Sequence, residues 1–342
     1  MSRKPNIVKQ AWLVINSSCN NHCSWCYEKK RLGNKEEFDY KLLRSTIKQL
    51  SLIGCKKIVF IGGEPSLYHK LKDAVGFASS TGLKQCIVTN GKVFSSESFL
   101  DRLNANKELT DFIVSFMGAS EITHDSLSQV RGSFIQSFKG LTEIIKKGFV
   151  ATPNFTVGSI NKNEIKQFIN KMKSIGVEAI SINFAIPPLG ITYTQENFLS
   201  PKEISLFLEG LSESLPDSTM KIYLSTPLPF CIIPNNARLL VESGIIVLTS
   251  CHIQSGEGIV IDKNLNLLVC THFSGFNLCN LQTLNTETKL SEYLSNPALL
   301  DLRSRIRQLP FEDCHECSYN TFCTGGCPLL NIIYNKDEWR VN

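Results

Sequence analysis

The sequence predicts an α/β fold, namely a partial (β/α)6 barrel followed by a small cysteine-rich domain. Strand-like and helix-like patterns alternate over residues 11–214, as they do in a parallel sheet covered by helices. Six such units fit an incomplete barrel better than the eight units of a closed one. Beyond them the composition changes, and most of the thirteen cysteines lie in the remainder of the chain.

The predicted barrel strands are short apolar runs, each followed by a helical pattern. The strands are expected at residues 11–16, 57–61, 85–89, 111–116, 149–157 and 177–184. The helices are expected at residues 39–52, 70–81, 97–105, 134–147, 162–175 and 201–214. In such sheets ligands bind at the carboxyl ends of the strands, so the loops that follow the first two strands are candidate sites.

A proline-containing segment, Pro227-Leu228-Pro229, indicates the end of the barrel. We place the boundary within residues 216–230, which gives a barrel over residues 1–222 and a second domain over residues 223–342. Short strands are expected in the second domain at residues 245–249, 258–261 and 267–269.

The composition excludes several classes of function. Apolar residues make up 42% of the chain and charged residues 20%, which is typical of a globular protein. Lys and Arg number 36 against 31 Asp and Glu, and they are scattered, so no nucleic-acid partner is expected. The apolar run Ala11–Ile15 is too short for a secretory signal, and no run approaches the ~18 residues of a membrane span. We therefore expect a cytoplasmic protein that does not bind membranes.

Three cysteines, Cys19-x3-Cys23-x2-Cys26, directly follow the first predicted strand. In a cytoplasmic chain such clustering indicates metal or redox ligands. Three thiolates can hold three irons of a [4Fe–4S] cube and leave the fourth iron open to an amino and a carboxylate group, both of which S-adenosylmethionine (SAM) offers. Trp25 is placed to pack against an adenine. The alternatives are buried thiols or a zinc site, for which His22 is a nearby but awkwardly placed fourth ligand.

A second motif, Gly62-Gly63-Glu64-Pro65, follows the second predicted strand. Glycines let a backbone approach a ligand closely, and carbonyls beside a carboxylate suit an ammonium group. Alone, the motif could be an ordinary tight turn. Because the motif lies one β-α unit after the cysteine loop, it indicates a ligand-binding loop at the same edge of the sheet.

Together these motifs resemble the radical SAM superfamily, which carries Cys-x3-Cys-x2-Cys and a Gly-Gly-Glu-Pro amine-binding motif. Further matches are Thr89-Asn90-Gly91 and His124-Asp125. The resemblance implies that the three cysteines hold a [4Fe–4S] cluster. It also implies that SAM binds the Gly62–Pro65 loop, with further candidate contacts at Trp25, Asn90, Ser115, Asn154 and Asn183. His124 could equally well fix the position of a loop.

A dense array lies near the C-terminus: Cys314-x2-Cys317-x5-Cys323-x3-Cys327. With the upstream Cys251 and Cys270, it resembles the SPASM extension of radical SAM enzymes, which carries auxiliary iron–sulfur clusters. The predicted second domain is therefore an iron–sulfur domain, and the resemblance covers essentially the whole chain. Two features depart from the family pattern: Leu265 stands where the family has glycine, and no cysteine follows Cys327.

The family rule divides these cysteines between one or two auxiliary clusters. It implies a first cluster on Cys251, Cys270 and Cys327, and a second on Cys314, Cys317 and Cys323. The remaining ligands stay open: Cys231 or His252 for the first cluster, and Cys279, Asp337 or Glu338 for the second, unless an iron stays open for substrate. A zinc-ribbon-like knob is the alternative. Cys55 and Cys86 are expected to be ordinary buried thiols.

The resemblance implies an enzyme that reductively cleaves SAM to a 5′-deoxyadenosyl radical, with an electron from a donor such as flavodoxin or ferredoxin. The SPASM pattern implies an oxidoreductase that matures a precursor peptide or protein by cross-linking, epimerisation or side-chain oxidation, as in natural-product peptide maturation. The predicted barrel begins near residue 11, so peptide recognition is expected to rest either on the barrel itself or on a separate peptide-recognition protein.

Three other functions stay open. Anaerobic sulfatase-maturating enzymes carry an aspartate base just after the upstream cluster cysteine, where this chain has Thr271. A radical SAM dehydrogenase acting on a sugar-type small molecule is the second alternative, and a non-catalytic iron–sulfur or zinc scaffold is the third. The sequence assigns no catalytic acid or base and no substrate.

Overall fold

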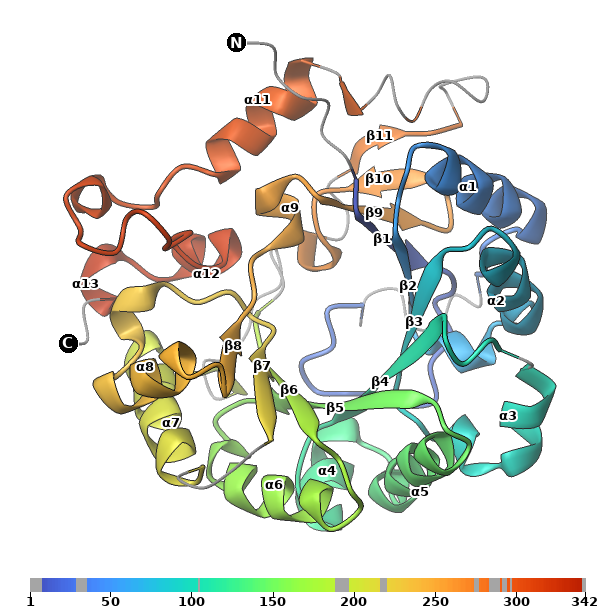
Figure 1. Cartoon of the computed structure of the whole chain (residues 1–342), viewed down its shortest axis with the longest axis horizontal. Coiled ribbons are helices and arrows are strands. Elements are labelled where there is room, and N and C mark those ends of the chain that lie inside the picture. The colour runs from blue at the N-terminus through green and yellow to red at the C-terminus, as the bar shows by residue number, and fades with distance from the viewer. Residues whose placement is uncertain are drawn as a thin grey trace.

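A computed structural model describes residues 8–28, 36–103, 105–187, 197–215, 220–273, 277–282, 290, 294–295 and 297–339. The described strands form one eleven-stranded sheet in the order β11-β10-β9-β1-β2-β3-β4-β5-β6-β7-β8. Figure 1 shows this sheet curved into an open ring with helices around its outside. The predicted fold class, a partial barrel with its helices outside the sheet, is confirmed.

The six predicted barrel strands are present and pair in parallel, in chain order. They are β1 (Gln10–Val14), β2 (Lys57–Ile61), β3 (Lys84–Thr89), β4 (Thr110–Phe116), β5 (Val150–Val157) and β6 (Ala179–Phe184). Two further parallel strands, β7 (Lys221–Leu224) and β8 (Ile246–Leu248), extend the sheet beyond β6. The β-α alternation in the sequence therefore predicts the first six strands, and two more continue the series.

Helices cover the outer face of this sheet. They are α1 (Tyr40–Leu52), α2 (Leu71–Ser80), α3 (Glu97–Leu103), α4 (Glu121–Ser128), α5 (Ser133–Lys146), α6 (Ile165–Lys173), α7 (Pro201–Glu213) and α8 (Asn235–Glu242). Side-chain hydrogen bonds determine where two of these helices begin. The Asp39 carboxylate accepts hydrogen bonds from backbone amides in the first turn of α1, and Ser200 and Glu203 form a capping box at the start of α7. Helix α4 was not predicted, because its eight residues carry only a weak apolar pattern.

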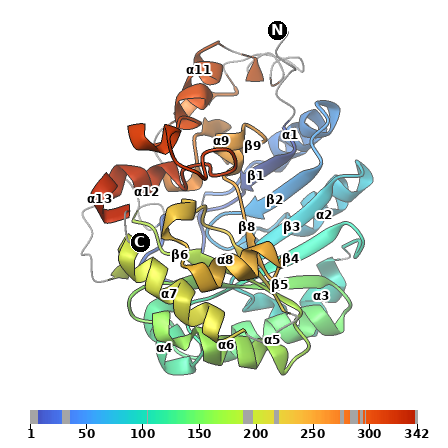
Figure 2. The same cartoon turned by 60° about the vertical axis from the view of Figure 1, so that its left-hand side comes forward.

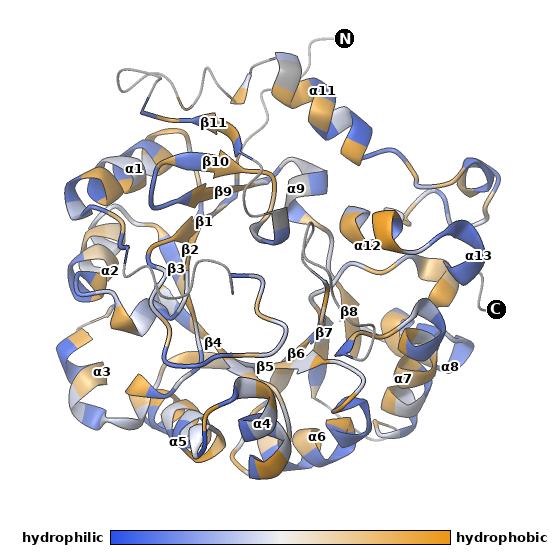
Figure 3. Ribbon diagram, turned by 180° about the vertical axis from the view of Figure 1, so that it is seen from behind, coloured by the Kyte–Doolittle hydropathy of each residue, from blue (hydrophilic) through white to orange (hydrophobic). Residues whose placement is uncertain are grey.

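The core has two layers. A large outer layer fills the space between sheet and helices, and Phe94, Phe112, Phe116, Phe155 and Phe168 are fully buried in it. A small inner layer lies inside the ring and includes Val14, Val59, Ile61, Cys86 and Val260. Figure 3 shows the apolar residues along the strands and the mixed character of the surrounding helices. The inner layer closes the floor of the ring, so the polar side chains at the strand ends lie above an apolar base.

The C-terminal part of the chain joins the same sheet. β9 (Gly258–Asp262) pairs in parallel with β1, and β10 (Asn266–Leu268) and β11 (Asn277–Asn280) follow as antiparallel strands. The short strands expected at 245–249, 258–261 and 267–269 match β8, β9 and β10. The sheet thus runs on through the expected domain boundary at residues 216–230, which stays a prediction.

In the described part of the remaining chain, the helices are α9 (His252–Ser255), α11 (Pro297–Ile306), α12 (Pro328–Ile333) and α13 (Lys336–Trp339). Figure 2 shows α12 and α13 on the side of the ring where α7 lies. The Tyr334 hydroxyl donates to the Leu199 carbonyl at 2.9 Å, and the Trp339 ring is buried, so this segment is anchored to the barrel. Among the described residues, no helix is long and apolar enough to span a bilayer.

Candidate active site

The loop that carries Cys19, Cys23 and Cys26 crosses the mouth of the ring (Figure 1). It leaves the carboxyl end of β1 and reaches the far side, where the His22 and Ser24 amides donate to the Ser128 and Leu127 carbonyls at 2.9 and 3.0 Å. The loop is thus held at both ends, at strand β1 and at helix α4.

The glycine loop after β2 packs directly on this cysteine loop. The Gly63 amide donates to the Asn16 carbonyl at 2.9 Å, and the Glu64 amide donates to the Ser18 carbonyl at 2.7 Å. A Cβ at Gly62 would lie 2.4 Å from Asn16 Oδ1, and one at Gly63 would lie 2.3 Å from the Ser18 carbonyl oxygen. Both positions therefore need glycine because two loops meet there, a reason that the sequence alone did not reveal.

Glu64 is buried, and its hydrogen bonds connect the carboxyl end of β2 to that of β3. Its Oε1 accepts from Ser66 Oγ at 2.7 Å and from Thr89 Oγ1 at 2.6 Å, and its Oε2 accepts from the Asn90 amide at 2.7 Å. Burial raises the pKa of this carboxyl, although the hydrogen bonds oppose the shift. Oε2 accepts from the Asn90 amide, and a carboxylate oxygen has a second lone pair with which an ammonium group could interact. Pro65 begins the short buried turn that follows.

The loop that follows β3 is hydrogen-bonded to the cysteine loop. Asn90 Nδ2 donates to Asn20 Oδ1 at 2.6 Å. The buried Lys92 donates from Nζ to the Asn20 carbonyl at 2.7 Å and to Asn21 Oδ1 at 3.0 Å. Burial lowers the pKa of Lys92, and the nearby Cys19 and Cys23 oppose this shift. The sequence analysis missed Lys92, whose only signal was its place directly after Asn90-Gly91.

The three thiols of the cysteine loop share one environment. Burial raises the pKa of Cys19 to about 11 and that of Cys23 to about 12, and in each case the charge on neighbouring cysteines adds to the shift. Thiolates this close together need a cation to hold them, so the residues fit an iron–sulfur cluster. In the described part of the chain no three His, Cys, Asp or Glu side chains form a group for a single metal ion. A cube is wider than one ion, so its ligands stand farther apart.

Trp25 packs beneath the cysteine loop on the side of α4. Its Nε1 lies 3.1 Å from Met117 Sδ, and its ring packs with Leu127 and Phe198. A Cβ at Gly158 would lie 3.0 Å from Trp25 Cζ3, so one ring face rests on a glycine backbone. The predicted contact between Trp25 and an adenine stays a prediction.

The polar residues predicted on later strands lie side by side. Ser115 on β4 is directly opposite Asn154 on β5, which is opposite Ser181 on β6. Asn183 lies one inward position farther along, opposite Thr156. Their strand neighbours Phe116, Phe155 and Ile182 belong to the outer core, so this polar row lines the inside of the ring. Ser181 was not predicted, because single serines in strands carry no distinctive pattern.

His124 and Asp125 position a loop. His124 Nδ1 accepts from the Met117 amide at 3.2 Å. Asp125 accepts from the Phe134 amide at 2.9 Å and from Ser133 Oγ at 3.0 Å. Burial would raise the pKa of Asp125, but these bonds outweigh burial and hold it below its usual value. These contacts support the alternative given in the sequence analysis, in which His124 fixes the position of a loop.

Residues 13–172, which contain both motifs, match the family model described as the Radical SAM superfamily. The chain carries a radical SAM domain. The chain is also similar to the Fe-coproporphyrin III synthase of Methanosarcina barkeri, with 28% identity over 152 residues, or 43% of this chain and 36% of that protein. It is similar to the subtilosin biosynthesis protein AlbA of Bacillus subtilis, with 24% identity over 177 residues, or 51% of this chain and 39% of that protein. The chain spans about a third to a half of the curated relatives it first matches.

Two solved structures share the fold beyond the radical SAM domain. Streptococcus suis SuiB has a TM-score of 0.73 at 15% identity, covering 98% of this chain and 76% of that one. The structure of anSMEcpe with bound AdoMet and Cp18Cys peptide has a TM-score of 0.69 at 17% identity, covering 93% of this chain and 88% of that one. At these identities the likeness concerns the fold, which includes the C-terminal part of the chain.

The C-terminal thiols of the chain fall into two groups. Burial raises the pKa of Cys327 to about 12, and the charges of Cys251 and Cys270 add to the shift, so these three thiols lie near one another. Burial likewise raises the pKa of Cys314, with contributions from Cys323 and Cys317. The division into two clusters that the family rule implies stays a prediction. Cys279 lies on β11 opposite Leu267, and Cys55 and Cys86 are buried as expected.

The first of these groups abuts the radical SAM domain. His272, two residues after Cys270, packs against Tyr27, one residue after Cys26, with ring centroids 5.0 Å apart. Lys263, in the turn between β9 and β10, is buried and contacts the Ser17 hydroxyl. The two cysteine-bearing segments therefore meet at the mouth of the ring.

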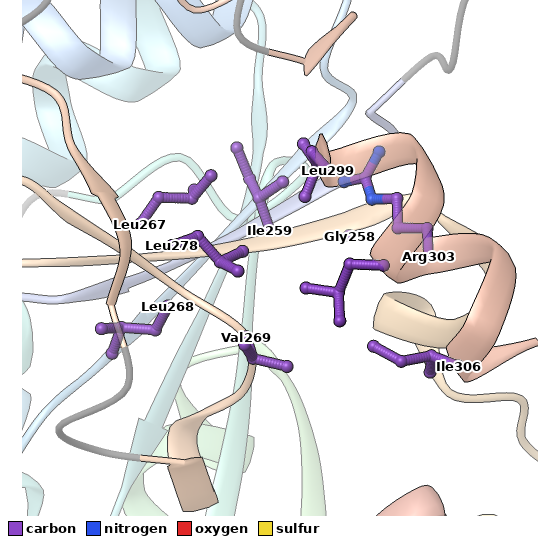
Figure 4. Close-up of a pocket in the computed structure, with 10 residues that line it drawn as sticks. Gly258, Ile259, Leu267, Leu268, Val269, Leu278, Leu299, Arg303 and Ile306 are labelled. Carbon is purple, nitrogen blue, oxygen red and sulfur yellow. The ribbon is translucent and has the colours of Figure 1, made fainter. Parts of the chain in front are cut away.

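A separate cavity lies between α11 and the strands β9, β10 and β11 (Figure 4). It is lined by apolar residues such as Leu267, Leu299 and Ile306, together with Arg303. Its volume of about 10 Å³ is room for one water molecule at most, so it is no substrate site.

Proposed function

We propose that this chain is a radical SAM enzyme that modifies a peptide substrate, with one or two auxiliary iron–sulfur clusters on its C-terminal cysteines. The observation that carries the proposal is the meeting of the two cysteine-bearing segments at the mouth of the ring, through Tyr27 and His272 and through Lys263 and Ser17. A substrate bound there would touch both segments.

In this proposal Cys19, Cys23 and Cys26 hold the radical SAM cluster. When bound, the cluster and SAM supply a 5′-deoxyadenosyl radical that can take a hydrogen atom from an unactivated carbon. The residues of the chain position these groups: Asn90 and Lys92 fix the cysteine loop, and the Gly62–Pro65 loop lies directly against it. The apolar floor of the ring excludes water from below.

The polar row Ser115, Asn154 and Asn183 is proposed to contact SAM from the opposite wall. These side chains offer hydroxyl and amide groups that both donate and accept, as the ribose hydroxyls and the carboxylate of SAM require. We propose Trp25 as a neighbour of the adenine because its ring lies beneath the same loop.

A peptide substrate is favoured by the two structures that share the fold over most of the chain. SuiB has been solved bound to its precursor peptide SuiA, and anSMEcpe with bound peptides. We infer a substrate of the same class here, a precursor peptide or protein in the cytoplasm. An electron donor such as flavodoxin or ferredoxin and a separate peptide-recognition protein are the proposed partners.

The sulfatase-maturating alternative is less favoured, because Thr271 stands at the position of the general base. Its hydroxyl lies 3.4 Å from His272 Nδ1, and a hydroxyl is a far weaker base than a carboxylate. A small-molecule substrate stays as the other alternative, since the curated relatives include a synthase of an iron porphyrin.

The test is anaerobic turnover with SAM and dithionite, followed by liquid chromatography and mass spectrometry. We expect 5′-deoxyadenosine from the wild type and none from the Cys19→Ala, Cys23→Ala, Cys26→Ala triple variant. The matched control is Cys55→Ala, which removes a buried thiol outside the site. Failure of the wild type to form 5′-deoxyadenosine would reject radical SAM chemistry.

A second experiment tests the class of substrate. Short peptides encoded beside the gene are added, and their masses and side-chain stereochemistry are compared before and after turnover. Loss of hydrogen atoms or inversion at a Cα, dependent on SAM, supports peptide maturation. Turnover stimulated by a sugar or tetrapyrrole, with every peptide unchanged, would reject it.

A further inference from the structure

The second group of C-terminal thiols has three cysteines from the array and no later cysteine to complete it. Cys314, Cys317 and Cys323 lie in one loop, and amides of this part of the chain point at two of the sulfurs. Tyr319 donates to Cys317 Sγ at 3.5 Å, and Gly325 donates to Cys323 Sγ at 3.4 Å. Amide donors toward sulfur are what cluster-bound thiolates require. Three thiolates leave one iron of a four-iron cube without a cysteine ligand, so the side chains that pack on this loop are candidates for the fourth ligand.

The segment after β7 packs on this loop. The Phe230 amide donates to Cys323 Sγ at 3.4 Å, and the Cys327 amide donates to the Pro227 carbonyl at 2.9 Å. The Phe230 ring lies 4.7 Å from that of Tyr319 and 4.9 Å from that of Phe322. The segment is therefore fixed against the array on both sides of Cys323.

Close packing at Gly326 holds the same segment in place. A Cβ at Gly326 would lie 2.6 Å from Pro229 Cδ, so the two backbones touch there. Gly326 also has a φ of +79°, which L side chains rarely adopt. The Gly325-Gly326 pair thus serves to bring residues 227–230 against the cysteine array.

Cys231 is the next residue of this segment, within the turn Phe230–Ile232. Its neighbour Phe230 donates its amide to Cys323 Sγ at 3.4 Å, which places Cys231 beside the array. Its Sγ is 3.9 Å from the Trp339 carbonyl of α13. One thiol from the end of the barrel therefore lies beside the three thiols of the array.

The sequence offers Cys231 for the first cluster and Cys279, Asp337 or Glu338 for this one, but Cys279 and Glu338 are less well placed. Cys279 is held on β11, paired with Leu267 of β10 at the sheet edge. Glu338 accepts from the Asn335 amide at 2.8 Å and so caps α13. Thiolate is also the ligand that iron–sulfur clusters use almost throughout, which favours a cysteine over a carboxylate.

We propose that Cys231 is the fourth thiolate of an iron–sulfur cluster held by Cys314, Cys317 and Cys323. The proposal rests on the auxiliary clusters of the proposed function. On binding, the Cys231 thiol gives up its proton to solvent and its sulfur bonds to the iron that the array leaves open. This second cluster would then be fully ligated by protein. Any iron open to substrate would belong to the group of Cys251, Cys270 and Cys327, which lies nearer the radical SAM domain.

The first test measures iron, acid-labile sulfide and zinc in anaerobically reconstituted protein. The background is the Cys19→Ala, Cys23→Ala, Cys26→Ala variant, which leaves the C-terminal clusters alone and should bind about eight irons if two four-iron cubes form. Adding Cys231→Ala should lower this to about seven irons with a [3Fe–4S] electron paramagnetic resonance signal, or to about four irons if the cube is lost.

The matched control in the same background is Cys279→Ala, which should leave the iron count and the spectrum unchanged. Equal iron and an unchanged spectrum after Cys231→Ala, or loss of iron from Cys279→Ala instead, would overturn the proposal. Zinc in place of iron at the array would also overturn it. A background protein without iron would reject the auxiliary clusters themselves, a failure separate from the choice of ligand.

A second test needs no variant and so does not depend on folding of a mutant. The Cys231 residue is exposed to solvent, so a maleimide should label it in cluster-free wild-type protein. After reconstitution the same peptide should be protected, as judged by mass spectrometry. Equal labelling of Cys231 with and without iron and sulfide would refute its ligation.

Discussion

Replacing Gly63 by alanine should separate the glycine loop from the cysteine loop. The added Cβ would lie 2.3 Å from the Ser18 carbonyl oxygen and 2.7 Å from that of Ser17, both of which are backbone atoms. A carbon and an oxygen pack no closer than roughly 3.2 Å, so one loop must move by about 1 Å. That shift would strain two hydrogen bonds, Gly63 to Asn16 at 2.9 Å and Glu64 to Ser18 at 2.7 Å.

The expected cost follows from these contacts. Overpacking of this kind costs about 1–3 kcal/mol, and weakening two buried hydrogen bonds adds about 1–2 kcal/mol, so we expect about 3 kcal/mol of lost stability. For a chain of 342 residues, at about 2.1 cal/mol/K of unfolding entropy per residue, that corresponds to a fall in Tm of roughly 4 °C. The measurement is thermal unfolding of the cluster-free protein by circular dichroism, with SAM cleavage assayed on the reconstituted protein.

The chain offers a matched control at Gly76, in helix α2, where an added Cβ meets nothing within 4 Å. Gly76→Ala should raise stability by about 0.5–1 kcal/mol, because glycine is unfavourable inside a helix. If Gly63→Ala has the same Tm and SAM cleavage rate as the wild type, the two loops do not depend on the contact described, and the reasoning fails.

Three further predictions concern the site and its support. Lys92→Met removes the donor to Asn20 and Asn21, so the cysteine loop should lose iron to a chelator several-fold faster than in the wild type under anaerobic conditions. The control Lys84→Met, at an exposed position, should leave the rate of iron loss unchanged. Equal rates for the two variants would contradict the prediction. In cluster-free protein the raised pKa of Cys23, about 12 against an ordinary 9.0, means that the folded state holds this proton more tightly than the unfolded state. Stability should therefore fall as pH rises above about 9, and a Cys23→Ala variant should show a flatter Tm–pH curve. Asp39→Ala removes the cap of α1 and should lower the free energy of unfolding by about 1 kcal/mol, while the rate of SAM cleavage per folded molecule stays the same. If SAM cleavage falls by more than the amount of folded protein does, Asp39 has a role besides capping.

The sequence predicted those parts of the fold that depend on local pattern. Strands β1 to β6 are runs of apolar residues of strand length, and the cysteine spacing is visible without any structure. The pairing of β9 with β1 was not predicted, because nothing within either five-residue strand encodes a partner some 250 residues away.

The same distinction applies to the candidate site. Cys19, Cys23 and Cys26 stand out by spacing, but Lys92 acts through contacts to residues more than 70 positions earlier in the chain. Gly62 and Gly63 were predicted as binding residues, while the structure gives them a second purpose, which is the close contact of two loops. The grouping of Cys231 with the C-terminal array likewise depends on how the segment after β7 packs, which its own sequence does not encode.

The parallel pairing of β1 with β9 has a consequence for how the protein is made. β1 carries the cysteine loop, and one of its two neighbours begins at Gly258, while the Gln10 amide donates to the Glu257 carbonyl at 3.1 Å. During synthesis, the strand that precedes Cys19 cannot complete its hydrogen bonding until residues 258–262 have left the ribosome. Contacts so distant in sequence form slowly, so stable insertion of iron should await the release of the segment that contains β9.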